Sequence, residues 1–589
     1  MLGGDQPWGT PGRRWDFIGW RFSLLLVVGL LGIIGTIVYT TLPGGRLQGV
    51  VLDAYSGKPV EGATVTAGTQ HTVSNAKGTF RIDPGSSSSI AIEKPEYDSS
   101  QATISPTQQA IEIQLRPNTV RGKVVARDTH KPLSGVTVEA KAAGETAAST
   151  KTDNQGVFAL TPVPEGASLV ISHDGYATKT IALGDQTALD FSLRSDVITG
   201  VVTDEQGKPL SGATIAAGDA RATSADDGTY RLTGIPDAGS VSIKSPGYRA
   251  SLSPIADNAR VDAKLERFNA KAIYATAATA GRPDLLNPLI DLIDRTELNA
   301  IVVDLKGSTG DVFYDTKVQL AHDIGAVQPA FEVKPLLDLL HQHQAYVIAR
   351  IVVFEDPVLA EARPEWAIHD STTGDLWRTW NGLAWVNAHR PEIWDYDIAL
   401  AREAAGLGFD EIQLDYIRFP SDGPLNRAEY GVPHDDQTRP GAIRDFLTRA
   451  HDALQPTGAY LSGDVFGLAM WDTGDSGIGQ HLEDVIGAVD FVCPMVYPSH
   501  FSNGSLGFDI PNNHPYEVIL TSMQEGAKRV PRDTAKIRPW LQDFTLGDGI
   551  AYGVTEVQKQ IQASDEAGTS GWMLWNAANL YHDGALRPQ

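Results

Sequence analysis

Polar side chains at the ends of short apolar runs are the residues whose type and spacing could do chemistry, and Asp415 is the clearest example. The run GFDEIQLDYIRFP (residues 408–420) alternates apolar and polar positions, as a strand with two different faces does. Alternation places Gln413 and Asp415 on one face and Leu414 on the other. A carboxylate at a strand end can serve as acid, base or nucleophile, or it can only pair with an arginine such as Arg350.

A second carboxylate, Asp464 in the run LSGDVFG, is the predicted catalytic partner of Asp415. Hydrolysis of a glycosidic bond needs one group to protonate the leaving oxygen and another to meet the oxocarbenium-like carbon. If the two runs form neighbouring strands, about 4.8 Å apart, their spacing favours the retaining over the inverting arrangement. Asp304 and Asp543 also lie at the ends of apolar runs and remain alternatives to Asp464.

Side chains predicted to bind substrate surround this pair. The segment 362–394 is rich in tryptophan and in hydrogen-bonding groups, and flat indoles can stack on sugar rings. Some of these tryptophans are expected to belong to the core, Trp394 among them. Arg418 shares the outward face by strict alternation, so it reaches the site only if the strand ends or bends near Ile417. The predicted substrate-binding residues are Asp304, Arg350, Trp377, Trp380, Asn387, Gln413, Arg418, Tyr497, Trp540, Gln542, Asp543 and Asn576.

Alternating strand-like and helix-like segments, from about residue 267 onward, must position these side chains. The strand-like runs begin near residues 272, 300, 346, 410, 459, 489, 536 and 571. Eight such alternations predict a TIM (β/α)8 barrel over residues 267–589, in which the carboxyl ends of the strands meet at one rim. The same alternation predicts that Asp304 and Lys306 share the inward face. No helical pattern follows Asn579, so the last closure of the barrel is expected to be irregular.

Three repeats precede the barrel. The runs GVVLDAYSGKPVEGATV, GKVVARDTHKPLSGVTV and GVVTDEQGKPLSGATI share one frame, and SNAKGTFRI, TDNQGVFAL and SADDGTYRL share a second. Short alternating strands between Gly, Pro, Asn and Asp turns predict small all-β sandwiches at residues 46–116, 117–195 and 196–266. These repeats resemble the carboxypeptidase regulatory-like domain, a transthyretin-like sandwich. The resemblance implies spacer or interaction modules.

The N-terminal segment predicts a membrane anchor. Residues 22–42 form an uncharged apolar run of sufficient length to cross a bilayer, and Arg13, Arg14 and Arg21 precede it. This arrangement predicts a cytoplasmic segment at 1–21, a single transmembrane helix at 22–42 and an extracytoplasmic remainder, so that the chain is located in the cell membrane. A cleaved signal peptide is the alternative, although no small-residue cleavage site follows the run.

Composition narrows the partners further. The formal net charge of −24 disfavours binding to the phosphate backbones of nucleic acids, so no nucleic-acid partner is expected. The single Cys493 excludes an intramolecular disulfide framework. No metal-ligand spacing, phosphate-binding loop or dinucleotide motif is present, so no metal and no cofactor are predicted. The sequence gives no indication of the oligomeric state.

The C-terminal half resembles a known family. The runs VIARIVVFED, WVNAHRPEIWDY, GFDEIQLDYIRFP, SGDVFG, MVYPSHF and RPWLQDF are similar to the putative glycoside hydrolase domain family over residues 268–580. The resemblance implies a barrel hydrolase that acts on polysaccharide, and it leaves the catalytic pair open. The leading hypothesis is a membrane-anchored, outward-facing glycoside hydrolase of an envelope or extracellular polysaccharide. A non-catalytic glycan-binding barrel and a polysaccharide deacetylase or lyase are the alternatives.

Overall fold

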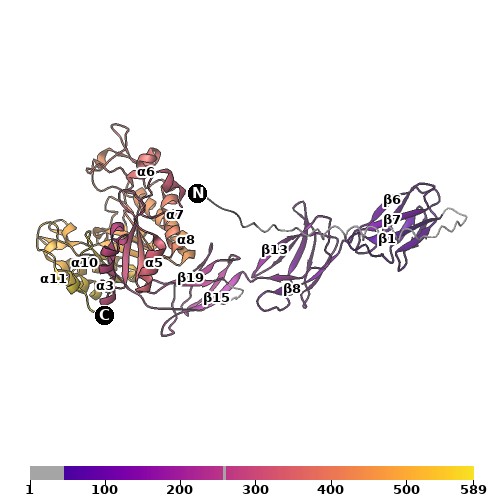
Figure 1. The fold of residues 1–589 in the computed structure, drawn as a ribbon, viewed down its shortest axis with the longest axis horizontal. Helices are drawn as coiled ribbons and strands as arrows, with labels where there is room; N and C mark the ends of the chain where they lie inside the picture. Colours follow the sequence, from indigo (N-terminus) through magenta and orange to yellow (C-terminus); the bar gives the residue numbers. More distant parts are fainter. Residues whose placement is uncertain (1–45, 256–259) are drawn as a thin grey trace, which may run out of the picture.

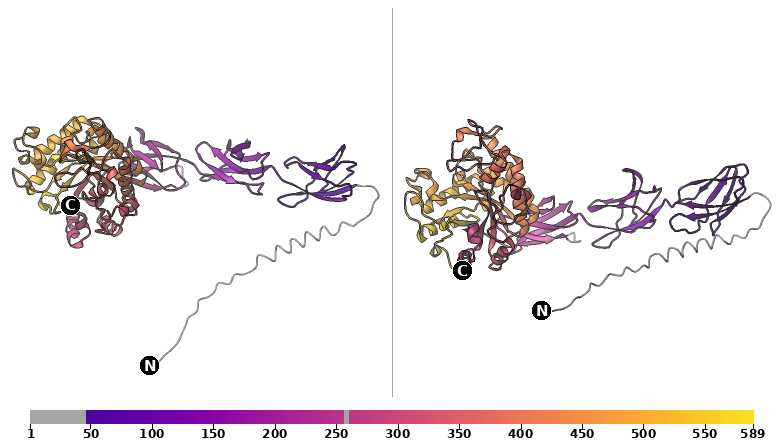
Figure 2. Two further views of the ribbon diagram at one scale, coloured as in Figure 1. Left: turned by 90° about the horizontal axis from the view of Figure 1, so that it is seen from above. Right: turned by 45° about the horizontal axis from the view of Figure 1, so that its top comes forward.

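The computed structural model describes residues 46–255 and 260–589, which form three β-sandwiches in a row followed by one large barrel domain (Figure 1). Figure 2 shows the same order from two further directions, with the third sandwich against the barrel. The predicted segments 1–21 and 22–42 lie outside the described residues. Within the described part of the chain, no helix combines the length and the apolar character needed to cross a bilayer.

The three sandwiches share one topology, which confirms the predicted repeats. Each has a three-stranded sheet facing a four-stranded one, with orders β4-β1-β7 and β3-β2-β5-β6 in the first, β11-β8-β14 and β10-β9-β12-β13 in the second, and β18-β15-β21 and β17-β16-β19-β20 in the third. The strands of the first are β1 (Leu47–Asp53), β2 (Thr64–Ala67), β3 (Gln70–Val73), β4 (Thr79–Ile82), β5 (Ser89–Glu93), β6 (Ser100–Thr103) and β7 (Ala110–Leu115). Those of the second are β8 (Val120–Ala126), β9 (Thr137–Ala142), β10 (Glu145–Lys151), β11 (Val157–Leu160), β12 (Ser168–His173), β13 (Tyr176–Ala182) and β14 (Phe191–Leu193). Those of the third are β15 (Val197–Asp204), β16 (Thr214–Ala217), β17 (Ala220–Thr223), β18 (Thr229–Thr233), β19 (Ser240–Lys244), β20 (Ser251–Pro254) and β21 (Ala263–Leu265).

A repeated glycine explains part of the shared sequence frame. Gly200 of β15 opens the frame of the third repeat, and the backbone at Val261 passes directly beside it. A Cβ atom there would come within 1.8 Å of the carbonyl oxygen of Val261. Only glycine permits this close backbone approach.

All eight predicted barrel strands are present, and they close in chain order. The strands are β22 (Ala270–Ala275), β23 (Ala300–Lys306), β24 (Tyr346–Val352), β26 (Glu411–Asp415), β28 (Tyr460–Phe466), β29 (Phe491–Met495), β30 (Trp540–Gln542) and β31 (Gly571–Trp575). Neighbours pair in parallel throughout, and β31 returns to pair with β22. A two-stranded sheet of β25 (His369–Asp370) and β27 (Ala428–Glu429) joins two loops outside the barrel.

Helices cover the outside of the barrel. They are α2 (Ala277–Ala280), α3 (Pro283–Arg295), α4 (Gln319–Asp323), α5 (Val333–Gln342), α6 (Pro357–Ala362), α7 (Pro391–Leu407), α8 (Thr438–Leu454), α9 (Leu482–Ala488), α10 (Pro515–Arg529) and α11 (Val554–Glu566). The outward residues Ile412 and Leu414 pack into the same apolar cluster as these helices. In residues 576–589, all of which are described, a 3-10 turn at Asp583–Ala585 takes the place of an eighth α-helix, as expected from the sequence.

The structure corrects one local expectation about the strands, the face of Lys306, and shows what ends the first strand. The first strand ends at Ala275, because Thr276 caps the short helix α2 through its side-chain oxygen. Lys306 does not share the inward face of Asp304, because the register of β23 shifts between these two residues. The ammonium group of Lys306 is instead buried between Asp356, at 2.7 Å, and Asp397 of α7, at 2.9 Å.

The third sandwich is joined to the amino-terminal end of the barrel by buried polar contacts. Lys244, which is 1% exposed, donates to the carbonyl oxygen of Ala459 at 2.9 Å and to Asp490 at 3.1 Å. The hydroxyl of Tyr460, at the start of β28, donates to the carbonyl oxygen of Tyr248 at 2.8 Å. This sandwich therefore closes the barrel end opposite the candidate site.

Candidate active site at the carboxyl ends of the barrel strands

Asp415 ends β26 and faces the barrel axis, as alternation predicts. Its Oδ2 accepts two hydrogen bonds from Arg350 of the neighbouring strand, from Nε at 3.0 Å and from Nη2 at 2.6 Å. The third donor used by this guanidinium, Nη1, binds Asp304 at 2.7 Å. Arg350 is thus shared between carboxylates of the strands on either side, and Asp304 also accepts a hydrogen bond from the hydroxyl of Tyr274.

Asp464 lies beside Asp415 on the next strand but in a different environment. The pairing of Leu414 with Gly463 places the two carboxyl groups at neighbouring positions of β26 and β28. Asp464 is 1% exposed and accepts a hydrogen bond from the indole Nε1 of Trp540 at 2.9 Å. Burial, followed by the charge of Asp415, raises the pKa of Asp464 well above its usual value. The site therefore places a carboxyl group with a raised pKa next to an ion-paired one.

Aromatic rings surround this pair. Tyr274 and Trp575 stack with ring centroids 4.1 Å apart, and Trp540 meets Trp575 edge-on at 5.5 Å. Tyr497, which follows β29, is buried, and burial together with the charge of Asp464 raises its pKa. Low polarity around the carboxyl groups strengthens every electrostatic interaction among them.

Arg418 enters the site region because the chain bends directly after the strand, as the alternation argument required. Tyr416 has a positive φ of 54°, in the left-handed region that a tyrosine rarely adopts. Beyond this bend the guanidinium of Arg418 lies 4.8 Å from the ring centroid of Trp385 and 4.9 Å from those of Tyr416 and Phe466.

Several predicted substrate-binding residues are instead placed where they support loops. Trp377 is fully buried and its Nε1 donates to the carbonyl oxygen of Pro424 at 3.1 Å, so its faces are covered. Asn387 is 2% exposed and donates to the carbonyl oxygen of Tyr430 at 2.8 Å. Trp380 lies at the opposite extreme, 75% exposed.

Three further predicted residues bind the segments that follow β29, β30 and β31. Gln542 accepts the backbone N–H of Ser499 and donates to the carbonyl oxygen of Phe544. Asn576 donates to the carbonyl oxygen of Asp543. The side chain of Asp543 pairs with His582, and burial raises its pKa despite that contact. Gln413 is fully buried on the axis below the carboxyl pair, and Trp394 packs on Phe446, as expected for a core tryptophan.

Sequence reasoning missed Glu355, which follows β24. It is 8% exposed, and among the described residues no hydrogen bond or ion pair reaches its carboxyl group. Burial, against a smaller opposing effect of Arg418, raises the pKa of Glu355 to about 7. The available signal was its position in VVFED, directly after an apolar strand, where the acid was attributed no role. Tyr274 and Trp575 were missed in the same way, as inward-facing aromatic residues at strand ends.

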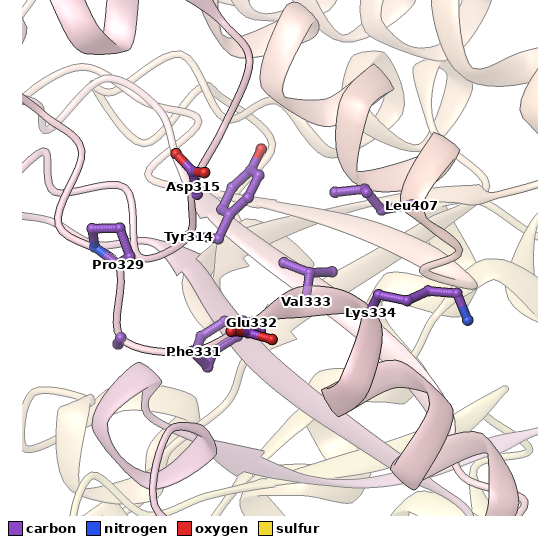
Figure 3. A pocket seen from close by; sticks show the side chains of 9 residues that line it. Tyr314, Asp315, Pro329, Phe331, Glu332, Val333, Lys334 and Leu407 are labelled. Atoms are coloured by element: carbon purple, nitrogen blue, oxygen red, sulfur yellow. The ribbon is translucent and has the colours of Figure 1, made fainter. Parts of the chain in front are cut away.

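One cavity of the barrel domain lies away from this rim. It has a volume of about 630 Å³ and lies between the loop after β23, the start of α5 and the end of α7, lined by Tyr314, Phe331 and Lys334 among others (Figure 3). None of the predicted site residues lines it, so it belongs to the outer helical layer. In the described ranges, no group of three or more His, Cys, Asp or Glu side chains is arranged to hold a metal ion.

Two protein-family models match the chain. The family model described as "Putative glycosyl hydrolase domain" matches residues 272–581, and the carboxypeptidase regulatory-like domain model matches residues 46–116, 119–194 and 197–266. No curated protein matches the chain.

Similar solved structures include a hypothetical protein from Ruminiclostridium thermocellum ATCC 27405, 36% identical, covering 33% of this chain and 97% of that one, with a TM-score of 0.31. The glycoside hydrolase domain of PgaB (BpsB) from Bordetella bronchiseptica is 13% identical, covering 53% of this chain and 95% of that one, with a TM-score of 0.39. The spore cortex-lytic enzyme SleL from Bacillus cereus is 13% identical, covering 57% and 75%, with a TM-score of 0.34.

Proposed function

Because the chain belongs to the putative glycosyl hydrolase domain family, we propose that its barrel hydrolyses glycosidic bonds of a polysaccharide with Asp415 and Asp464 as the catalytic pair. The observation that carries the assignment is the contrast between these adjacent carboxyl groups. Asp415 is ion-paired with Arg350, whereas Asp464 is buried against the indole of Trp540 and has a raised pKa. When their environments separate the pKa values of two carboxyl groups, the group with the higher pKa is assigned as the acid and the other as the base or nucleophile.

In this proposal Asp464 keeps its proton at neutral pH and delivers it to the leaving glycosidic oxygen. Asp415 supplies the carboxylate that meets the oxocarbenium-like carbon directly or through water. Arg350 holds Asp415 in orientation, and Asp304 shares the positive charge of Arg350. Trp540 orients Asp464 through its N–H, and Trp575 and Tyr274 provide apolar ring surface beside the pair.

We extend the proposal to location. The uncharged run at 22–42 after three arginines supports a single-pass anchor with the barrel outside the cytoplasm. The row of three sandwiches then separates the barrel from the membrane, which suits an envelope or extracellular polysaccharide as substrate.

The test is cleavage of a polysaccharide panel by the full chain, measured as new reducing ends and by mass spectrometry of the products. We expect Asp415→Asn and Asp464→Asn each to lower the rate about 10²- to 10⁴-fold, the usual contribution of a positioned acid or base. Asp291→Asn, on the exposed face of α3, is the matched control and should leave the rate unchanged.

Other outcomes of the same experiment identify the alternatives. Binding of glycan without any new reducing end would identify a non-catalytic binding barrel. Release of acetate that chelators abolish would identify a deacetylase, and unsaturated products would identify a lyase. Normal cleavage by both folded variants would remove Asp415 and Asp464 from the mechanism.

A further inference from the structure

The guanidinium of Arg418 is a buried cation whose hydrogen-bonding capacity is mostly unused. The residue is 8% exposed, yet its one hydrogen bond within the described residues runs from Nη1 to the carbonyl oxygen of Phe419 at 3.1 Å. Its other nitrogen atoms are not among the buried polar atoms without a hydrogen-bond partner, so these N–H groups are exposed to solvent. The donors are therefore free and accessible.

Arg350 of β24, which pairs with Gln413 on the strand that leads to Arg418, has the opposite hydrogen-bonding state. Its guanidinium donates three hydrogen bonds and forms ion pairs with Asp304 and Asp415. Arg418 forms no ion pair within the described part of the chain. Burial lowers the pKa of Arg418, although Tyr416 and Glu355 act in the opposite direction. Arg418 thus bears a desolvation cost that nearby carboxylates offset only in part, since none of them forms an ion pair with it.

The position of the Arg418 guanidinium is fixed by rings rather than by acids. Trp385, Tyr416 and Phe466 lie within 4.9 Å of it, from the loop after β24, the bend after β26 and the end of β28. Stacking on aromatic rings holds the plane of a guanidinium and leaves its edge free for bidentate contact with a carboxylate. A rigid, unpaired guanidinium beside a glycosidase centre suits an acidic group on the substrate.

We propose that Arg418 binds the carboxylate of a uronic acid residue, so that the substrate is an acidic polysaccharide. The inference rests on the proposed function, because it names the class of substrate that the carboxyl pair would cleave. The inference also assigns a role to Glu355, as a competitor of the substrate carboxylate. Near neutral pH, where its pKa lies, this carboxyl group changes from neutral to charged, and the charged form competes for Arg418. The charged groups acting on Glu355 are Arg418, Asp422, Asp415 and Arg350.

The experiment measures equilibrium binding to full chains that carry Asp415→Asn to prevent turnover. The probes are galacturonate, glucuronate and mannuronate oligosaccharides, each beside its carboxyl-reduced, neutral form. We expect at least one acidic probe to bind about 10- to 100-fold more tightly than its reduced form, as a hydrogen bond to a charged group contributes. Arg418→Gln should abolish this preference, whereas Arg402→Gln, on the exposed face of α7, should retain it.

A second variant keeps the inference testable if Arg418→Gln does not fold. Glu355→Gln removes the competing charge, so binding of the acidic probe at pH 8 should become tighter than in the parent chain. At pH 6, where Glu355 is already neutral, the two chains should bind alike. Weaker binding by Glu355→Gln at both pH values would mean that Glu355 organises Arg418 as a structural partner, and would contradict the inference.

The outcomes separate the inference from the proposed function. Equal binding of acidic and reduced probes, with cleavage of neutral glycans by the unmodified chain, would overturn the acidic substrate and leave the hydrolase intact. Preferential binding of acidic probes through Arg418, without cleavage of any glycan, would support the inference and overturn the hydrolase. Binding of no probe would overturn the acidic substrate, and the cleavage panel would then decide the hydrolase alone.

Discussion

The barrel interior contains two polar layers on the same strands, and they differ in whether their charges are matched. In the lower layer, Glu411 of β26 is fully buried and pairs with Arg538, while Ser462 donates to it at 2.5 Å and Tyr346 at 3.1 Å. In the upper layer, four residues further along β26, Asp415 shares Arg350 with Asp304, and Asp464 is present without a cation of its own.

The difference shows how one strand can carry structure and chemistry together. The single carboxylate of the lower layer is satisfied by one guanidinium and two hydroxyl groups, so nothing is left to react. The upper layer has one acid more than its guanidinium can pair, and burial raises the pKa of the surplus acid. An inward carboxylate is therefore a functional candidate when the charges around it do not balance.

The largest effect on stability is expected from the lower layer. Glu411→Gln leaves Arg538 as an unpaired buried cation, which should lower the free energy of unfolding of the barrel by about 3–5 kcal/mol. Chemical denaturation followed by tryptophan fluorescence measures this in the barrel rather than in the sandwiches, because residues 46–266 contain no tryptophan. A loss no larger than that of a surface substitution would remove the structural role given to this layer.

The next effect concerns the pH dependence of stability in the upper layer. Asp464 has a folded-state pKa above its unfolded one, so the folded chain binds more protons and its stability falls as pH rises from about 4 toward the folded pKa. Asp464→Asn removes this fall. The free energy of unfolding of the variant, relative to that of the unmodified chain, should therefore rise by up to about 1.4 kcal/mol per pH unit in that window. Parallel stability curves for the two chains would contradict the raised pKa.

A smaller effect than that of Glu411→Gln is expected from Ser462→Ala, in the same layer. This change removes one hydrogen bond to Glu411 and should cost about 1–3 kcal/mol, because the acceptor is buried and paired with Arg538. Glycan cleavage per folded molecule should stay the same, since Ser462 lies in the lower layer. Loss of cleavage with normal stability would erase the distinction between the layers.

The smallest effect is expected from Trp540→Phe. The indole N–H favours the charged form of Asp464, so its loss should raise the pKa of this acid further. The alkaline limb of the pH–rate profile should therefore move to higher pH, while the acidic limb stays in place. A shift to lower pH would mean that Asp464 is not the proton donor.

Alternation along the strands was sufficient to predict the inward face of β26 and all eight barrel strands, because period-2 patterning is local. It failed at Lys306, where a register shift that depends on the neighbouring strand reverses the face. It also could not tell Trp377, which is covered, from Trp380, which is exposed, since both lie in an irregular loop. Glu355 was missed because no alternation extends beyond the end of a strand.

The docking of the third sandwich shows the same limit. Tyr97, Tyr176 and Tyr248 occupy equivalent positions in the three repeats. The residue four positions before each tyrosine is Glu93 in the first sandwich, Ser172 in the second and Lys244 in the third. The first two are exposed or half-buried, whereas Lys244 is buried against the barrel. The three repeats differ in sequence at this position, but only the folded chain shows that Asp490 of the barrel is the partner of Lys244.

The most direct test of the account is the rate of glycan cleavage by Asp464→Asn and Ser462→Ala, two substitutions on β28 that lie in different layers. The account predicts a loss of about 10²- to 10⁴-fold for Asp464→Asn and an unchanged rate per folded molecule for Ser462→Ala. Cleavage at the unmodified rate by folded Asp464→Asn would contradict it.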